Sequence, residues 1–288
     1  MAQQNTLKAY YHMIKPGIVR GNAITAAAGF LLASKDGFYL GNFIAMLAGI
    51  SLVIASACVL NNYIDRGIDA KMERTKKRAL VSGKISVQNA MIYAAVLGIG
   101  GLVSLSFTGL LTISLALIGV FFYVVVYAVA KRKTVHGTLV GSIAGAIPIS
   151  VGYCAASGAF DIGAILLFLI LVFWQMPHFY AIAIYRQKDY RAAGIPVLPI
   201  EKGLQNTKIQ IAGYIVAFIV ATYTLMIFGF TGYTYLLVMA LLGVWWLKLA
   251  VQGFSVKDNE KWARKVFRFS LIVLLAFSIM ISVEVFLP

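Results

Sequence analysis

Long apolar stretches alternate with short polar ones along almost the whole chain. Nine stretches are rich in Leu, Ile, Val, Phe and Ala, and a helix of about 20 such residues spans the ~30 Å hydrocarbon layer of a bilayer. The repeated alternation typical of a membrane β-barrel is absent from the sequence. The pattern predicts an all-α polytopic membrane protein with helices over residues 17–34, 40–60, 88–106, 109–130, 138–157, 162–184, 208–229, 232–251 and 268–287.

Composition supports lipid as the solvent of these helices. Of the 288 residues, 61% are hydrophobic and 12% are charged, with a mean hydropathy of +0.86, whereas soluble domains carry about 25% charged residues. The polar stretches are too short for a soluble domain, so we expect residues 1–288 to form a single integral membrane domain. Cys58 and Cys154 lie in predicted helices without metal-ligand spacing, which favours neither a disulfide nor a zinc site.

The positive charge is concentrated in alternate loops. The net charge is +15, and of 25 Lys and Arg residues all but Lys35 fall on the same side of the predicted helices as the N-terminus. The positive-inside rule then predicts a cytoplasmic N-terminus and an external C-terminus. This distribution argues against a nucleic-acid partner. The first residues lack the apolar core of a signal peptide, which favours a bacterial inner (plasma) membrane.

Asn61, Asp65 and Asp69 form the strongest candidate site. Residues four apart on a helix point about 40° apart, so all three share one face, and Asn62 lies close to it. Two carboxylates and an amide oxygen suit Mg²⁺, which would grip diphosphate oxygens. The alternative is a solvated loop whose acids pair with nearby cations such as Arg66. A position at the membrane boundary favours a functional role, because ionisable groups are costly there.

Basic residues near these acids would supply the other half of a diphosphate site. Arg74 and Arg78 follow the acids in the same loop, and Tyr127 and Lys131 stand four apart at the cytoplasmic end of the fourth predicted helix. Cations beside a leaving diphosphate offset its developing charge. For Lys131 the alternative is a lysine that merely extends its ammonium to the membrane interface.

A third cluster lies in the cytoplasmic half of the predicted 162–184 helix. Trp174 and His178 share a face, and Pro177 between them predicts a kink. A membrane histidine often only bonds a neighbouring helix, whereas the functional interpretation is contact with a large, flat substrate. Asp189 follows 11 residues after the histidine and is the second candidate acid for a metal or phosphate site.

The chain resembles the UbiA-type superfamily of intramembrane prenyltransferases, which are nine-helix bundles, and within it the protoheme IX farnesyltransferases. The resemblance covers nearly the whole chain. It rests on the stretches KPGIVRGN, NNYIDRGIDAKMERT, KRKTVHGTLVGSIAGAIP, WQMPHFYAIAIYRQKDY and AGIPVLP. Quinone-forming relatives usually carry Asn-Asp where this chain has Asn61 and Asn62. A quinone-precursor prenyltransferase is therefore the first alternative. A transporter of anionic phosphate lipids is the second, but polar groups gathered at one membrane face favour an enzyme.

The resemblance implies transfer of the farnesyl group of farnesyl diphosphate to the 2-vinyl group of heme b, with addition of water, giving heme O. It implies Mg²⁺, or Mn²⁺, as the metal, heme b as a substrate rather than a cofactor, membrane lipid as surroundings, and heme-modifying or oxidase-assembly proteins as partners. Together with the motif chemistry, it assigns catalysis to Asp65, Asp69, Lys131 and Tyr127. Substrate binding is assigned to Asn61, Asn62, Arg74, Arg78, Lys15, Trp174, His178 and Asp189. Metal binding is assigned to Asn61, Asp65, Asp69 and Asp189.

The chain departs from the family pattern at two positions. The second motif has one acid, Asp189, where many superfamily members have two, which puts a full second metal site in doubt. Ala79 stands where many relatives have proline, a change that affects the loop more than the chemistry.

Overall fold

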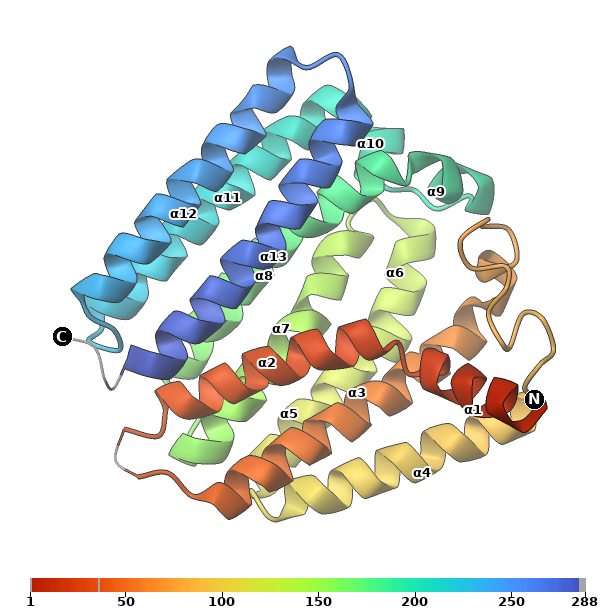
Figure 1. Ribbon diagram of the computed structural model, residues 1–288, viewed down its shortest axis with the longest axis horizontal. Helices are drawn as coiled ribbons and strands as arrows, with labels where there is room; N and C mark the ends of the chain where they lie inside the picture. Colours follow the sequence, from red (N-terminus) through yellow and green to blue (C-terminus); the bar gives the residue numbers. More distant parts are fainter. Residues whose placement is uncertain (1, 36, 285–288) are drawn as a thin grey trace.

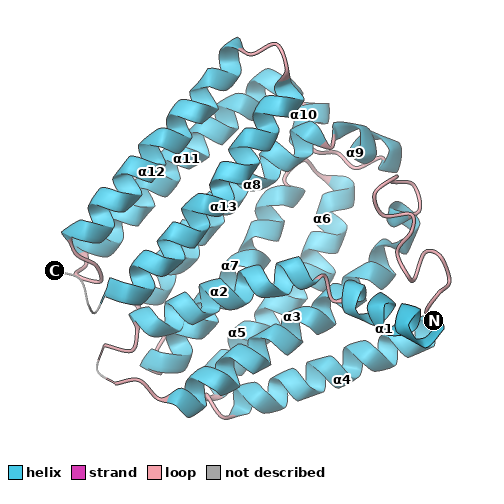
Figure 2. Ribbon diagram, viewed as in Figure 1, coloured by secondary structure: helices cyan, strands magenta, loops and turns pink. Residues whose placement is uncertain are grey.

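The chain folds as a bundle of long helices in a computed structural model that describes residues 2–35 and 37–284 (Figure 1 and Figure 2). No strand occurs in the described residues. The elements are α1 (Ala2–Met13), α2 (Pro16–Leu32), α3 (Leu40–Asp69), α4 (Val87–Ser106), α5 (Leu110–Phe121), the π-helical turn η1 (Phe122–Val126), α6 (Tyr127–Lys133), α7 (Gly137–Ser157), α8 (Ile162–Tyr185), α9 (Gln187–Ala193), α10 (Leu198–Glu201), α11 (Gly203–Ile227), α12 (Tyr233–Gln252), the 3₁₀ turn η2 (Gly253–Ser255) and α13 (Asn259–Val283).

The predicted all-α polytopic architecture is confirmed. Within the described residues, eight helical segments are long and apolar enough to cross a membrane, with α5, η1 and α6 together forming one of them. The predicted helix over residues 17–34 corresponds to α2, which has 17 residues and is not among these eight. It packs against α3, α7 and α13.

Several predicted helix boundaries miss polar turns that the structure includes, and the last helix and α3 show why. The last helix was predicted from residue 268 but begins at Asn259, where Asp258 accepts a hydrogen bond from the backbone N–H of Lys261. Its first turns are amphipathic, with Trp262 buried and charged side chains outward, so apolarity alone cannot detect them. Similarly, α3 continues to Asp69 and has 30 residues, which at 1.5 Å per residue is about 45 Å and exceeds the hydrocarbon thickness.

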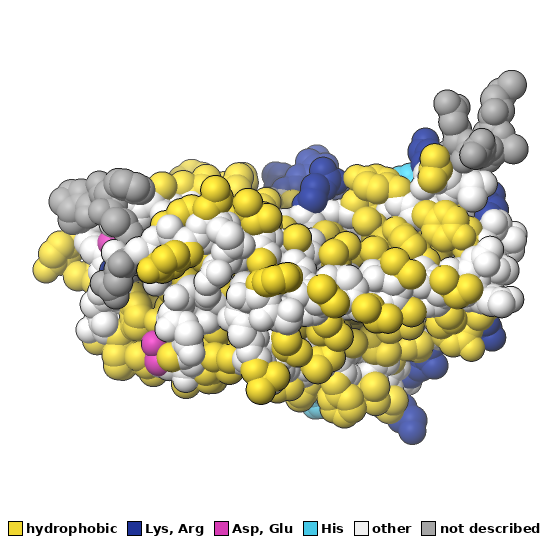
Figure 3. Space-filling view, turned by 90° about the horizontal axis from the view of Figure 1, so that it is seen from below, with side chains coloured by type: hydrophobic (Ala, Val, Ile, Leu, Met, Phe, Trp, Pro, Cys, Tyr) yellow, Lys and Arg dark blue, Asp and Glu magenta, His cyan; other side chains and the backbone are white. Residues whose placement is uncertain are grey.

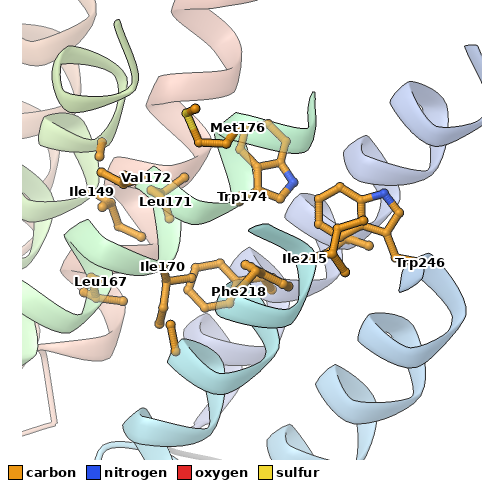
Figure 4. Packing of buried hydrophobic residues seen from close by; sticks show 14 of the residues in the cluster. Ile149, Leu167, Ile170, Leu171, Val172, Trp174, Met176, Ile215, Phe218 and Trp246 are labelled. Carbon is orange, nitrogen blue, oxygen red and sulfur yellow. The ribbon is translucent and has the colours of Figure 1, made fainter. Parts of the chain in front are cut away.

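Helices α7 and α8 form the interior of the bundle. One apolar core lies among α7, α8, α11, α12 and α13, and includes Trp174, Phe218 and Trp246 (Figure 4). A second core joins α7 to α2, α3 and α5. Because α7 belongs to both cores, it fixes the position of the α2–α3 half relative to the α8–α13 half.

Glycines bring α2 and α7 into backbone contact. A Cβ atom on Gly152 of α7 would lie 1.9 Å from the carbonyl oxygen of Ala26, and one on Gly29 of α2 would lie 2.3 Å from that of Ile149. Small residues permit such approach between membrane helices. The contact fixes α2, and with it the segment before α2 that enters the site described below.

The longer polar segments lie together at one end of the bundle. Figure 1 shows α9, α10 and the loop after α3 at this end, and the chain reversal between α11 and α12 at the opposite end. Apolar side chains cover most of the face seen in Figure 3, as expected for a surface in contact with lipid.

Candidate active site

A cavity of about 860 Å³ opens between α2, α3, the η1–α6 segment, α7, α8 and α13. Pockets for small molecules commonly have ~300–1,000 Å³. Its wall is apolar along the inner part of α3 and α7, as at Val53 and Ile147, and polar where α3 leaves the core, as at Asp65 and Asp69. The cavity therefore offers one polar end and one long apolar region.

The structure brings the three acid-motif residues together on one buried face of α3, and gives each a basic partner from a different segment. Asn61, Asp65 and Asp69 are 3%, 8% and 2% exposed, so their charges and dipoles require partners within the protein. Lys15 donates to Asn61 Oδ1 at 2.7 Å. Lys131 of α6 forms an ion pair with Asp65.

The remaining contacts of the acids come from the loop after α3 and from α6. Arg78 Nη1 lies 2.5 Å from Asp69 Oδ2, and the exposed Arg132 lies 3.4 Å from Asp65 Oδ1. The neighbouring Arg66 instead stacks over the ring of Tyr63, 4.6 Å from its centroid. The acids are thus paired through tertiary structure rather than with the adjacent cations of a solvated loop.

Lys15 occupies an unusual backbone position between α1 and α2. Its φ of 52° and ψ of 67° are left-handed, and it is the one non-glycine residue with positive φ among those described. Such strain is retained where surrounding contacts dictate the conformation. Burial lowers the pKa of the Lys15 ammonium to about 8. The strained turn directs this ammonium to Asn61, at the polar end of the cavity.

The two asparagines have different environments. Asn62 Nδ2 donates to the carbonyl oxygen of Met13 at 2.8 Å, and Asn62 Oδ1 accepts from Arg78 at 3.4 Å, so this side chain joins α1 to the loop after α3. It does not line the cavity. Asn61 does, and its buried Nδ2 has no hydrogen-bond partner among the described residues. An orphaned donor at this position suits an anionic ligand.

Tyr127 and Lys131 lie on the cavity wall as a pair, and the structure adds Tyr123, which the sequence interpretation missed. The rings of Tyr123 and Tyr127 are parallel with centroids 5.8 Å apart, and Lys131 Nζ lies 4.8 Å from the Tyr127 centroid. Tyr123 lies within the π turn η1 and Tyr127 directly follows this turn, and π turns occur frequently at functional sites. The spacing of four between each of these residues was the available sequence signal.

Trp174 and His178 lie on the α8 wall of the cavity, where both bond α13. Trp174 Nε1 donates to the Ser270 carbonyl oxygen at 2.9 Å, and His178 Nδ1 lies 2.7 Å from Ser270 Oγ. Their rings stack with centroids 4.7 Å apart. Helix α8 is continuous through Pro177. The histidine bonds a neighbouring helix through Nδ1, while Nε2 has no hydrogen-bond partner among the described residues, and His178 lines the cavity.

Arg74 lines the polar end of the cavity, but Asp189 does not. The Asp189 carboxylate lies 3.8 Å from Arg186, and its neighbour Tyr190 contributes to the cavity wall instead. Burial raises the pKa of Tyr190, and the nearby charge of Arg74 partly offsets this. No group of three His, Cys, Asp or Glu side chains suited to a metal occurs in the described part of the chain, so Asp189 is not gathered with the acids of α3.

The donor set on α3 nevertheless fits Mg²⁺. Protein sites usually hold this ion with one or two carboxylates and leave its other positions to water and substrate phosphates. Asp65 and Asp69 supply two carboxylates, Asn61 supplies an amide oxygen, and all three face the cavity. Three basic groups already lie against these oxygens, at Lys15, Lys131 and Arg78. The same cations could contact phosphate oxygens bound beside them.

This fold is that of the intramembrane prenyltransferases. The structure of digeranylgeranylglyceryl phosphate synthase in membranes superposes with a TM-score of 0.80 at 21% identity, covering 98% of this chain and 99% of that one. A UbiA homolog from Archaeoglobus fulgidus bound to GPP and Mg²⁺ gives a TM-score of 0.70 at 15% identity, covering 95% and 99%.

The sequence comparisons are more specific. The UbiA prenyltransferase family profile matches residues 22–272. The chain is 51% identical to the protoheme IX farnesyltransferase of Sodalis glossinidius, covering 98% of this chain and 96% of the relative. It is 52% identical to that of Yersinia enterocolitica with the same coverage. The chain belongs to the UbiA prenyltransferase family.

Proposed function

We propose that this protein transfers the farnesyl group of farnesyl diphosphate to the 2-vinyl group of heme b, with addition of water, and so forms heme O. The observation that carries the proposal is a cavity with an acid–cation cluster at one end and a stacked Trp174–His178 pair on another wall. The relatives named as protoheme IX farnesyltransferases, at 51% and 52% identity over nearly full length, support this choice of substrates.

Farnesyl diphosphate would bind with its diphosphate at the acid–cation cluster. Asn61, Asp65 and Asp69 would hold Mg²⁺ there, and the bound metal would supply positive charge that neutralises the diphosphate. The ammonium groups of Lys15 and Lys131 would donate to the phosphate and offset the charge that grows as the C1–O bond breaks. The bonding electrons leave with the diphosphate, and an allylic cation remains.

The cavity wall would protect this cation until the heme vinyl group captures it. The ring faces of Tyr123 and Tyr127 are electron-rich and lie beside the cluster, where they would stabilise positive charge. Apolar walls exclude water from the farnesyl chain. The terminal vinyl carbon bonds farnesyl C1, and the new cation next to the porphyrin takes a water oxygen and loses a proton. Heme b, farnesyl diphosphate and water thus give heme O, diphosphate and a proton.

Product analysis tests this proposal directly. Purified protein in detergent would be incubated with Mg²⁺, farnesyl diphosphate and heme b, and in parallel with 4-hydroxybenzoate instead of heme b. We expect heme O, identified by chromatography and mass spectrometry, and no prenylated benzoate. Prenylated benzoate without heme O would favour the quinone-precursor alternative. Intact farnesyl diphosphate with both acceptors would contradict a prenyltransferase function.

The charge distribution supports a second part of the proposal: the N-terminus and the loop after α3 face the cytoplasm of a bacterial inner membrane. Single cysteines at Glu73 and Ala159, both exposed, would be introduced into a chain whose buried Cys58 and Cys154 are replaced. In intact cells an impermeant thiol reagent should label Ala159→Cys but not Glu73→Cys. The reverse labelling would invert the topology.

A further inference from the structure

A chain of aromatic contacts leads from the cavity toward the end of the bundle that carries α9 and α10 (Figure 1). It begins at His178, whose ring centroid lies 4.9 Å from that of Phe267 on α13. The ring of Phe267 contacts Tyr185, the last residue of α8, with centroids 5.7 Å apart. The contacts therefore follow the seam between α8 and α13 out of the cavity.

Two guanidinium groups lie over the last ring of this chain. Arg264 Cζ is 4.7 Å and Arg186 Cζ is 5.6 Å from the centroid of Tyr185. Each has an acidic neighbour at 3.8 Å, Glu260 for the first and Asp189 for the second, with the arginine side chains 44% and 40% exposed. Such exposed, long ion pairs are weak. Each guanidinium has five N–H donors, so most of its donor capacity remains open.

Both arginines continue the cavity wall by one helical turn. Arg186, which caps the C-terminus of α8, follows the cavity-lining Ile182 by four residues, and its backbone N–H donates to the Ile182 carbonyl oxygen at 2.9 Å. On α13, Arg264 precedes the cavity-lining Phe267 by three. Residues three or four apart occupy neighbouring positions on one helix face. A ligand that fills the cavity at His178 and extends along this seam would reach the two guanidinium groups.

The hydrogen bonds of Ser270 determine what His178 can offer such a ligand. Ser270 Oγ donates its only hydrogen to the Phe267 carbonyl oxygen at 2.6 Å. It must therefore accept from His178 Nδ1–H at 2.7 Å. In a neutral imidazole, Nε2 then carries a lone pair rather than a hydrogen. This nitrogen can ligate iron but cannot donate to a carboxylate, so the heme propionates need other partners.

We infer that Arg264 and Arg186, held over the Tyr185 ring, bind the propionate carboxylates of heme b while His178 Nε2 faces the iron. This inference rests on the proposed function and names the part of the site that recognises its second substrate. From His178 to Tyr185 the helix rises about 10 Å, a distance on the scale of a porphyrin half-width with its propionate arm. Guanidinium groups form charge-assisted, bidentate bonds with carboxylates.

The test compares heme b with its dimethyl ester, in which both propionates are methylated. Binding of each to purified full-length protein would be titrated by absorbance. The wild type should bind the ester about ten- to 100-fold more weakly, a total of about 1.4–2.8 kcal/mol, because the ester lacks the carboxylate charges that the guanidinium groups would bind. Arg264→Gln and Arg186→Gln should each weaken heme b binding about tenfold, yet leave the affinity for the ester unchanged. Arg264→Lys should recover part of the loss because it keeps the charge.

Controls separate this inference from misfolding and from the proposed function. Lys248→Gln removes a cation that lies 5.5 Å from the centroid of Trp245. Lys248 is on α12, which contributes no residue to the cavity wall among the described residues, so this variant should change neither affinity. Binding of a non-hydrolysable farnesyl diphosphate analogue should stay intact in the arginine variants. Equal affinity of the wild type for heme b and its ester would overturn the inference alone. A wild type that binds no heme b would overturn both the inference and the proposed function.

Discussion

Replacing Asp65 by asparagine should destabilise the protein as well as stop its reaction. The side chains of Asp65 and Lys131 are only 12% and 9% exposed, so the substitution leaves a lysine charge in the interior without its carboxylate partner. Breaking a buried pair in this way costs about 3–5 kcal/mol. The additional contact with Arg132 is 3.4 Å long and 42% exposed on the arginine side, and contributes no more than about 1 kcal/mol.

A second substitution separates stability from catalysis. In Asp65→Asn/Lys131→Met the unpaired charge is gone, and replacement of a buried pair by apolar groups is often neutral. The double variant should therefore regain most of the lost ~3–5 kcal/mol, which appears as a coupling free energy between the two positions. It should form no heme O, because it lacks the carboxylate proposed to bind the metal and the ammonium proposed to bind the phosphate.

The assay combines equilibrium unfolding of the purified variants in mixed detergent with product analysis. A single variant as stable as the wild type would show that solvent, not the acid, compensates the Lys131 charge. A double variant less stable than Asp65→Asn would contradict the pairing. A double variant that turns over would remove both residues from the mechanism.

Three further predictions follow from the structure. Excess chelator should abolish heme O formation and added Mg²⁺ or Mn²⁺ should restore it, because in the proposed reaction Asn61, Asp65 and Asp69 bind diphosphate through a metal. Full turnover in chelator would contradict this. Gly152→Ala should lower the free energy of unfolding by at least ~1–3 kcal/mol, since its Cβ would lie 1.9 Å from a carbonyl oxygen of α2. Gly213→Ala, with open space around it, should raise the free energy of unfolding by ~0.5–1 kcal/mol. Equal unfolding free energies of the two variants would show that α2 moves to accommodate the Gly152→Ala methyl group. Ser270→Ala should weaken heme b binding and alter the iron-ligand absorbance. Ser278→Ala should change neither spectrum nor affinity, because the buried Ser278 hydroxyl on the same helix has no hydrogen-bond partner among the described residues.

The fold was largely predictable because lipid imposes a simple requirement on the sequence. Each apolar run must be about 20 residues long to span the bilayer, and the runs starting at residues 40 and 162 correspond to α3 and α8. The predictions failed where helices leave the hydrocarbon. The first turns of α13 carry Lys261 and Arg264 and form no continuous apolar run. One buried side chain, Trp262, packs these turns against the protein and stabilises them.

The acid motif of the site was readable, but its partners were not. Asn61, Asp65 and Asp69 share a face by helical geometry alone. Their contacts with Lys15 and Lys131 cross 46 and 66 residues of sequence, and no local spacing encodes which helices will meet. The spacing of four from Tyr127 indicated Lys131, whereas only the resemblance to a family indicated Lys15.

Other features of the site depend on backbone conformation or on a distant helix. The spacing of four places Tyr123 near Tyr127, but the π turn that contains Tyr123 and the parallel arrangement of the two rings do not follow from a 3.6-residue period. The orientation of His178 is set by Ser270, 92 residues away. The sequence showed a histidine on a helix face, whereas its available nitrogen followed only from the three-dimensional hydrogen-bond network.

The pairing of Asp65 and Asp69 with basic groups suits a site that would bind a metal–diphosphate complex. Unpaired charges in a low-dielectric interior are costly, and a free cluster at Asp65 and Asp69 would repel itself. Lys131 and Arg78 remove that cost in the absence of ligand. A metal–diphosphate complex carries both a cation for the carboxylates and an anion for the basic groups, so binding exchanges partners without leaving any charge unmatched. The acids lie on α3, and their basic partners lie on α6 and in the loop after α3. A bound metal–diphosphate complex would therefore hold these three segments around the substrate.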